Sequence, residues 1–206
     1  MTRIHIVGDS ISIQYGPYLQ AMLADTGIDY SRKSGEAEAL LNLDNPQGAN
    51  GGDSDRVLTY LKTMVKEGQL NADLLLVNCG LHDIKTNPDT GAKQVPLERY
   101  VANLKAMVQL ADSQPWSLVW IRTTPCNEHI HNRMNRHFHR FATDCQAYNQ
   151  AADRVMAEGG CPIIDLYTFT ANLGGDSYCD HVHFTESVRQ QQAAYMAGWL
   201  AHYRLR

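Results

Sequence analysis

The chain has 206 residues, of which 44% are hydrophobic, so it can bury a sizeable core and is not an intrinsically disordered protein. Eighteen lysines and arginines against 22 aspartates and glutamates give a formal net charge of −4, and this balance argues against a nucleic-acid partner. No apolar run approaches the ~20 residues that span a bilayer, and the first residues do not resemble a signal peptide. We therefore expect one domain over residues 1–206 with no membrane partner.

The five cysteines are scattered and odd in number, and none forms a C-x-x-C pair. This pattern suggests neither a disulfide framework nor a structural zinc site. Reduced thiols in the cytoplasm are the simplest expectation, although an exported protein whose leader has been replaced would look the same.

Apolar runs of strand length alternate with segments of helical period along the whole chain. Strands are expected at residues 3–7, 28–32, 73–79, 117–122 and 162–166, and helices at residues 11–24, 54–65, 96–112 and from 185 onward. An apolar stripe that includes Met134, Phe138 and Phe141 predicts one long helix ending at Gly159 and Gly160. Five strands separated by helices predict a three-layer α/β/α domain with a five-stranded parallel sheet.

Ligand sites in such folds lie beyond the carboxyl ends of the strands. Four polar stretches fall there: residues 8–10, 50–54, 80–83 and 180–183. Ser10 follows a Gly-Asp turn at a strand end and a helix start, where the helix dipole favours developing negative charge. Taken alone, Ser10 is equally compatible with a plain N-cap residue.

Asp180 and His183 are three residues apart in the last loop, so the carboxylate can fold back onto the imidazole and fix its tautomer. Ser10, Asp180 and His183 would then supply nucleophile, orienting group and base. The alternative is a metal site at Asp180, His181 and His183 with a further ligand from elsewhere.

A second group of histidines lies in the middle of the chain. It comprises His129, His131, His137 and His139. We expect the first two in a loop before the long helix, from which one of them could reach the substrate, and His139 pointing away from the core. A metal cluster is the alternative.

These residues together resemble the SGNH, or GDSL-like, hydrolases. The resemblance rests on Gly8-Asp9-Ser10, Gly52-Asp53-Ser54, Gly80-x-x-Asp83 and Asp180-x-x-His183, four blocks in the family's order that span residues 8–183. It implies a flavodoxin-like fold and hydrolysis of acyl esters without a metal or organic cofactor.

The resemblance also implies the role of each residue. Ser10 would be the nucleophile, His183 the general base and Asp180 its orienting group. The backbone N–H groups of Ser10 and Gly52 would line the oxyanion hole, with Gly51 as the competitor to Gly52. The third donor in the family is an asparagine, but this chain has His82 there, which can donate as a neutral imidazole or as an imidazolium.

The polar loops around these blocks favour an acetyl ester of a sugar or another small polar alcohol. Asp9, Asn50 and His129 are expected to contact this substrate. The alternatives are a lipase or thioesterase on the same triad, an acyltransferase, or a weakly catalytic binding protein in which His82 has impaired the oxyanion hole. The sequence does not indicate an oligomeric state.

Overall fold

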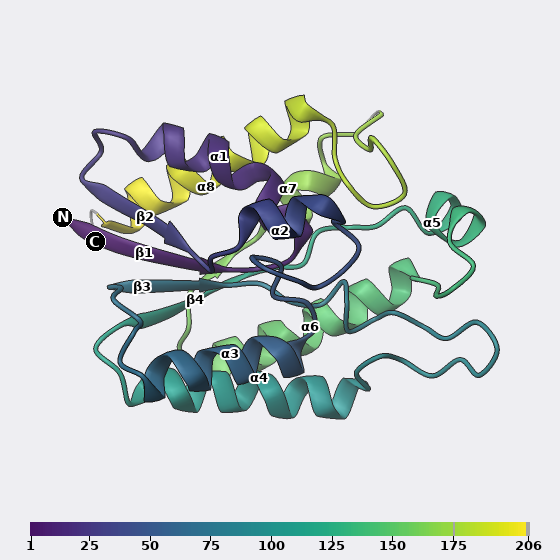
Figure 1. The fold of residues 1–206 in the computed structure, drawn as a ribbon, viewed down its shortest axis with the longest axis horizontal. Helices are drawn as coiled ribbons and strands as arrows, with labels where there is room; N and C mark the ends of the chain where they lie inside the picture. The colour runs from purple at the N-terminus through teal and green to yellow at the C-terminus, as the bar shows by residue number, and fades with distance from the viewer. Residues whose placement is uncertain (175, 205–206) are drawn as a thin grey trace.

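A computed structural model describes residues 1–174 and 176–204 and contains one five-stranded parallel sheet (Figure 1). Its strands are β1 (Thr2–Val7), β2 (Ile28–Arg32), β3 (Leu74–Val77), β4 (Ser117–Ile121) and β5 (Ile163–Ile164), in the order β2-β1-β3-β4-β5. Every pairing is parallel, from Thr2 opposite Ile28 to Ile121 opposite Ile164. The predicted fold class is confirmed.

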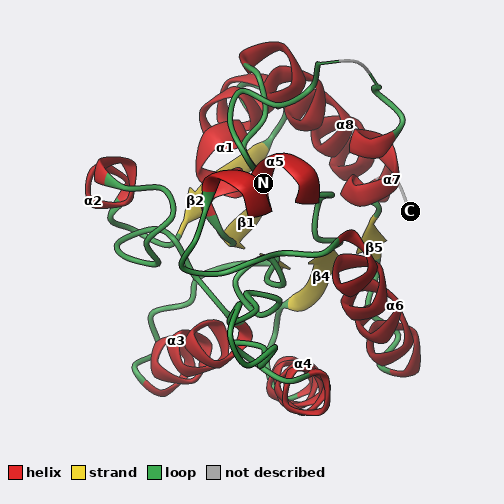
Figure 2. Ribbon diagram, turned by 90° about the vertical axis from the view of Figure 1, so that its right-hand side faces the viewer, coloured by secondary structure: helices red, strands yellow, loops and turns green. Residues whose placement is uncertain are grey.

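Helices cover both faces of the sheet (Figures 1 and 2). One layer contains α1 (Ser10–Leu23), α7 (Leu166–Ala171) and α8 (Glu186–Arg204), and the other contains α3 (Ser54–Lys66), α4 (Leu97–Asp112) and α6 (Ala142–Glu158). The central strands are apolar on both faces because both faces are covered, and Ile6, Leu76 and Val119 are fully buried.

The strand order reverses direction at β1. β2 lies on one side of β1 and β3 lies on the other. The connection from β1 to β2 and the connection from β2 to β3 therefore run in opposite directions across the sheet. In an open α/β sheet a crevice forms at such a switch point, at the carboxyl ends of the strands. Ser10 follows β1 directly and therefore lies at this crevice.

The prediction of one long helix from about residue 134 to residue 158 is wrong. The structure has α5 (Glu128–Met134), a non-helical segment and then α6, which begins only at Ala142. Asn135 Oδ1 accepts the N–H groups of His137 and Phe138, and His139 exchanges two backbone hydrogen bonds with Thr86. These contacts replace the helical ladder between Asn135 and Phe141, so His129 and His131 lie on α5 and not in a loop.

Two short helices were not predicted. The polar stretch after β2 contains α2 (Glu36–Leu41), and α7 follows β5 directly. Within residues 1–174 and 176–204, no helix combines the length and apolarity needed to cross a bilayer.

Candidate active site

Ser10 is held at the start of α1 by the turn that precedes it. Asp9 is the N-cap, and its Oδ1 accepts the N–H of Ile11 at 3.0 Å. Asp9 is 1% exposed, and burial raises its pKa above the ordinary value. Its side chain therefore shapes the turn that carries Ser10, and the substrate contact expected of it stays a prediction.

His183 joins Ser10 to Asp180. Its Nε2 lies 2.9 Å from Ser10 Oγ, and its Nδ1 lies 2.7 Å from Asp180 Oδ2. The other carboxylate oxygen, Oδ1, accepts the backbone N–H groups of Val182 and His183 at 2.8 and 2.7 Å. The last loop before α8 is thus folded around Asp180, and the histidine points at the start of α1.

The electrostatics of this chain of hydrogen bonds favour an ionised Asp180. Partial burial raises the pKa of its carboxyl, but the N–H donors of His183 and Val182 outweigh this effect and bring the pKa below the ordinary value. An ionised carboxylate on Nδ1 leaves Nε2 free to accept a proton from Ser10 and stabilises the imidazolium that results. The arrangement can activate a serine nucleophile.

Gly51 and Gly52 follow β2 in the sequence, and Gly51 lies beside Gly8, two residues before Ser10. The Gly51 N–H donates to Gly8 O at 2.9 Å. This N–H is therefore already used in a backbone hydrogen bond that continues the strand pairing. The Gly52 N–H donates to Asn50 Oδ1 at 3.0 Å. Gly52 has a φ of +72°, and a Cβ there would lie 2.7 Å from Pro46 Cβ, so both the backbone and the space require glycine.

Asn50 fastens the loop that carries these glycines. It is 1% exposed, its Nδ2 donates to Leu43 O at 3.1 Å, and its Oδ1 holds Gly52. Asn50 also lines the pocket beside this loop, so the substrate contact expected of it stays a prediction.

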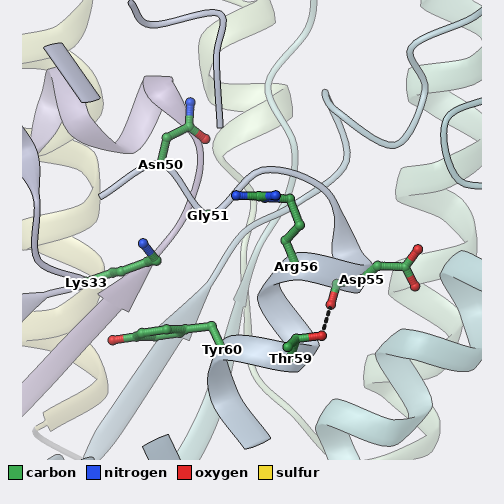
Figure 3. Close-up of a pocket in the computed structure, with 7 residues that line it drawn as sticks. All are labelled: Lys33, Asn50, Gly51, Asp55, Arg56, Thr59 and Tyr60. Carbon is green, nitrogen blue, oxygen red and sulfur yellow. Dashed lines mark hydrogen bonds between the residues drawn. The ribbon is translucent and has the colours of Figure 1, made fainter. Parts of the chain in front are cut away.

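A pocket of about 390 Å³ lies against the same loop, next to α3 (Figure 3). Its two cations hold the loop: Arg56 donates to Pro46 O at 2.6 Å, and the ammonium of Lys33 donates to Gly48 O. Figure 3 shows Arg56 extending toward Gly51. These groups keep the glycine loop in place against α3.

His82 and Asp83 lie in the loop after β3. His82 is 3% exposed, and its ring makes no hydrogen bond to any residue that the structure describes. Burial, aided by the charges of Lys85 and Arg140, lowers its pKa well below the ordinary value, so the imidazole is neutral. Asp83 Oδ1 accepts the N–H of Ser54 at 2.9 Å, which ties this loop to the start of α3.

The four middle histidines do not share one site. His129 lies beside a pocket of about 300 Å³ formed with Ile130, Arg133 and Met134. His131 is fully buried, and burial lowers its pKa to about 3. No three metal-binding side chains come together anywhere in the described ranges, 1–174 and 176–204.

Sequence reasoning missed Arg140. It is 2% exposed, and its Nε donates to Leu81 O at 2.7 Å, so it supports the loop that carries His82. Arg140 was overlooked because it lies between Phe138 and Phe141, two residues of the apolar stripe that predicted one long helix.

A hydrogen-bonded pair beside His183 was also missed. His181 Nδ1 lies 2.8 Å from His131 Nδ1, and its Nε2 lies 3.4 Å from Asp44 Oδ2. The only signal in the sequence was that His181 stands two residues before His183.

Comparison with known proteins gives one family match. The sequence model described as "GDSL-like Lipase/Acylhydrolase family" matches residues 6–190. No curated protein sequence matches the chain significantly.

Several solved structures share the fold. A lipase/acylhydrolase from Enterococcus faecalis has a TM-score of 0.74 at 17% identity, with 98% of this chain and 97% of that chain covered. A carbohydrate acetylesterase from Sinorhizobium meliloti has a TM-score of 0.66 at 14% identity, covering 98% and 100%. A mutant acetyl-xylooligosaccharide esterase from Geobacillus has a TM-score of 0.66 at 13% identity, covering 95% and 92%. At these identities the likeness shows the fold alone.

Proposed function

Because the chain belongs to the GDSL-like lipase/acylhydrolase family, whose members hydrolyse esters, we propose that its own reaction runs through Ser10, His183 and Asp180. The observation that carries the proposal is the hydrogen bond of 2.9 Å between His183 Nε2 and Ser10 Oγ, with Asp180 at 2.7 Å from the other ring nitrogen. These are the distances that a general base and its nucleophile require.

The proposed reaction has two halves. Ser10 Oγ attacks the ester carbonyl while His183 Nε2 takes the hydroxyl proton, and His183 then returns that proton to the departing alcohol. In the second half water attacks the acyl-serine carbonyl while His183 Nε2 takes its proton, and His183 returns this proton to Ser10 Oγ as the bond to the acyl group breaks and the acid leaves. Asp180 stabilises the imidazolium in both halves.

The oxyanion would be bound by N–H groups at the start of α1 and in the loops after β2 and β3. Ser10 is the first residue of α1, so its own N–H has no partner within the helix and the helix dipole assists it. Gly52 would share its N–H between Asn50 Oδ1 and the oxyanion. His82, a neutral imidazole free of other hydrogen bonds in the described structure, would supply the third donor.

For the substrate we propose an acetyl ester of a small polar alcohol, a carbohydrate included. The pocket beside His181 supports this choice, because Asp44, Asn135 and His181 line it with polar atoms. The names of two proteins with this fold, a carbohydrate acetylesterase and an acetyl-xylooligosaccharide esterase, agree with it.

The test combines active-site labelling with a series of acyl chains. A fluorophosphonate probe should label the protein and not its Ser10→Ala variant, and that variant should lose about 10⁶ in kcat on 4-nitrophenyl acetate. Among acetyl, butyryl and octanoyl esters, kcat/KM should be highest for acetyl. An apolar groove would reverse the trend, since each buried methylene contributes ~0.8 kcal/mol. Labelling that survives in Ser10→Ala would overturn the triad, and rising activity toward octanoyl would favour a lipase or thioesterase.

A further inference from the structure

The chain carries a strongly basic stretch in an acidic protein. Residues 129–140, here called the basic segment, contain three arginines and four histidines and no aspartate or glutamate, whereas the whole chain has a net charge of −4. The segment runs from α5 through the non-helical residues to Arg140. Such a local excess of positive charge is expected where an anion binds.

This basic segment borders the crevice at the carboxyl ends of the strands. Figure 2, which looks onto that edge of the sheet, shows α5 in front of the strands. His131 on α5 contacts His181 with 2.8 Å between the two Nδ1 atoms, and the ring of His181 lies 6.2 Å from that of His183. Only one ring therefore separates the segment from the proposed catalytic base.

A pocket of about 440 Å³ opens at this border. It is lined by Asp44, Met134, Asn135, Arg136, His137 and His181. Asp44 is the one acid in the lining, and the hydrogen bond from His181 lowers the pKa of its carboxyl to about 2. His181 faces Asp44, whereas the guanidinium of Arg136 lines the pocket without a carboxylate partner in the described structure.

The arginines of the segment have no counter-ions among the residues described. Within residues 1–174 and 176–204, no carboxylate lies within ion-pairing distance of Arg133, Arg136 or Arg140, whereas Arg3, Arg99 and Arg122 are paired with aspartates. Arg140 is 2% exposed, its side chain contacts Leu81 O, His131 and the ring of Phe138, and the carboxylates of Asp44 and Asp9 act on its charge only from beyond ion-pairing distance. A buried cation that is not directly paired is costly unless another group compensates its charge. A bound anion would provide that compensation.

We propose that this pocket binds the alcohol portion of the ester and that this alcohol carries an anionic group, of which a sugar carboxylate is the simplest case. The inference rests on the proposed function and narrows its substrate. Arg136 contacts the anion from the pocket wall, and the buried charge of Arg140 adds to the positive potential from behind. The acetyl group then points toward Ser10 and the charged sugar toward the basic segment.

The experiment uses two esters that differ only in charge: methyl 3-O-acetyl-β-D-glucuronoside and the corresponding glucuronamide. At low ionic strength, kcat/KM should be about tenfold higher for the anionic ester, and this ratio should fall in 0.5 M NaCl as the charges are screened. A third ester, acetylated glucose 6-phosphate, tests phosphate as the anion. A larger preference for phosphate over its neutral glucose ester would assign the site to phosphate.

Two arginine variants from the same segment locate the effect. In Arg136→Gln, the ratio of kcat/KM for the anionic ester to kcat/KM for the amide ester should lie within about twofold of unity. Arg133→Gln removes the same charge from the neighbouring pocket of His129, so the ratio should stay within twofold of the wild-type value. Both side chains are exposed, and unchanged circular dichroism will show that the variants fold.

Equal rates for the two esters with the wild-type protein would overturn the inference while leaving the esterase proposal standing. A charge preference that survives in Arg136→Gln would overturn it as well. Hydrolysis of neither ester, nor of 4-nitrophenyl acetate, would overturn the proposed function and this inference with it.

Discussion

His82 is the residue that we propose as the third oxyanion donor, at the position where the resemblance to the family implies an asparagine. If its neutral ring donates to the oxyanion, His82→Ala should lower kcat on 4-nitrophenyl acetate by about 10²–10³ and change KM little, because the charge exists only in the tetrahedral intermediate. His82→Asn should recover part of the loss.

The pH profile gives a second readout of His82. Burial holds the pKa of His82 well below the ordinary value, so this ring stays neutral as the pH rises above 6 and should add no descending limb to kcat. A kcat for His82→Ala within threefold of wild type would show that the oxyanion is bound without it. A descending limb of kcat with rising pH that is present in the wild type and absent in His82→Asn would show that the imidazolium is the donor.

Single residues also show where prediction from sequence stops. Ser10, Asp180 and His183 could be named because short motifs carry them, and the structure brings their side chains together. Arg140 and Asp44 belong to no motif. Their importance comes from contacts with Leu81 and His181, which are 59 and 137 residues away along the chain, and local patterns do not encode such contacts.

At the scale of elements, Asp83 couples the loop after β3 to the start of α3 through the N–H of Ser54. Burial raises the pKa of Asp83 from 3.8 to about 8, and its Oδ2 has no partner in the described structure. Because the folded pKa is the higher one, the stability that the protonated carboxyl contributes is present in full below about pH 4. It is lost as the pH rises through 8.

Asp83→Asn should remove this pH dependence, because the amide keeps an acceptor for Ser54 and cannot ionise. Between pH 5 and pH 9 the Tm of the wild type should fall by at least about 4 °C more than that of the variant, since 1 kcal/mol corresponds to roughly 2–4 °C in a domain of this size. Asp89→Asn, at an exposed position, is the control and should follow the wild type. Parallel Tm curves for all three proteins would refute the assignment.

The elements that could be predicted are determined by local sequence patterns, whereas those that were missed depend on contacts between residues distant in the sequence. All five strands are found at the predicted places, within a few residues at their ends, because a strand buried on both faces leaves a local apolar run. The break between α5 and α6 was missed because it depends on Thr86, which pairs with His139 across a distance of 53 residues. Of the residues that suggested an apolar stripe, Met134 is exposed at the end of α5, and Phe138 is half-buried in the irregular segment.

At the scale of the whole molecule, we predict that residues 1–206 unfold as one domain. The β1·β3 and β3·β4 pairings join both halves of the sheet, and α1 packs against α8. Far-UV circular dichroism should therefore give the same Tm as the fluorescence of Trp116 and Trp120, measured in a Trp199→Phe variant. Two separated transitions would divide the chain into more than one unit.

The bond between His183 and Ser10 closes a loop of 173 residues, which has a consequence for the kinetics of folding. Contacts so distant in sequence form late, because the entropy of the intervening chain must be lost first. In a refolding protein the nucleophile and its base meet only when α8 has docked on α1, after the tryptophans near β4 can already be buried. The rate at which hydrolysis recovers thus reports the rate of the last folding step, and an intermediate with a complete sheet would still be inactive.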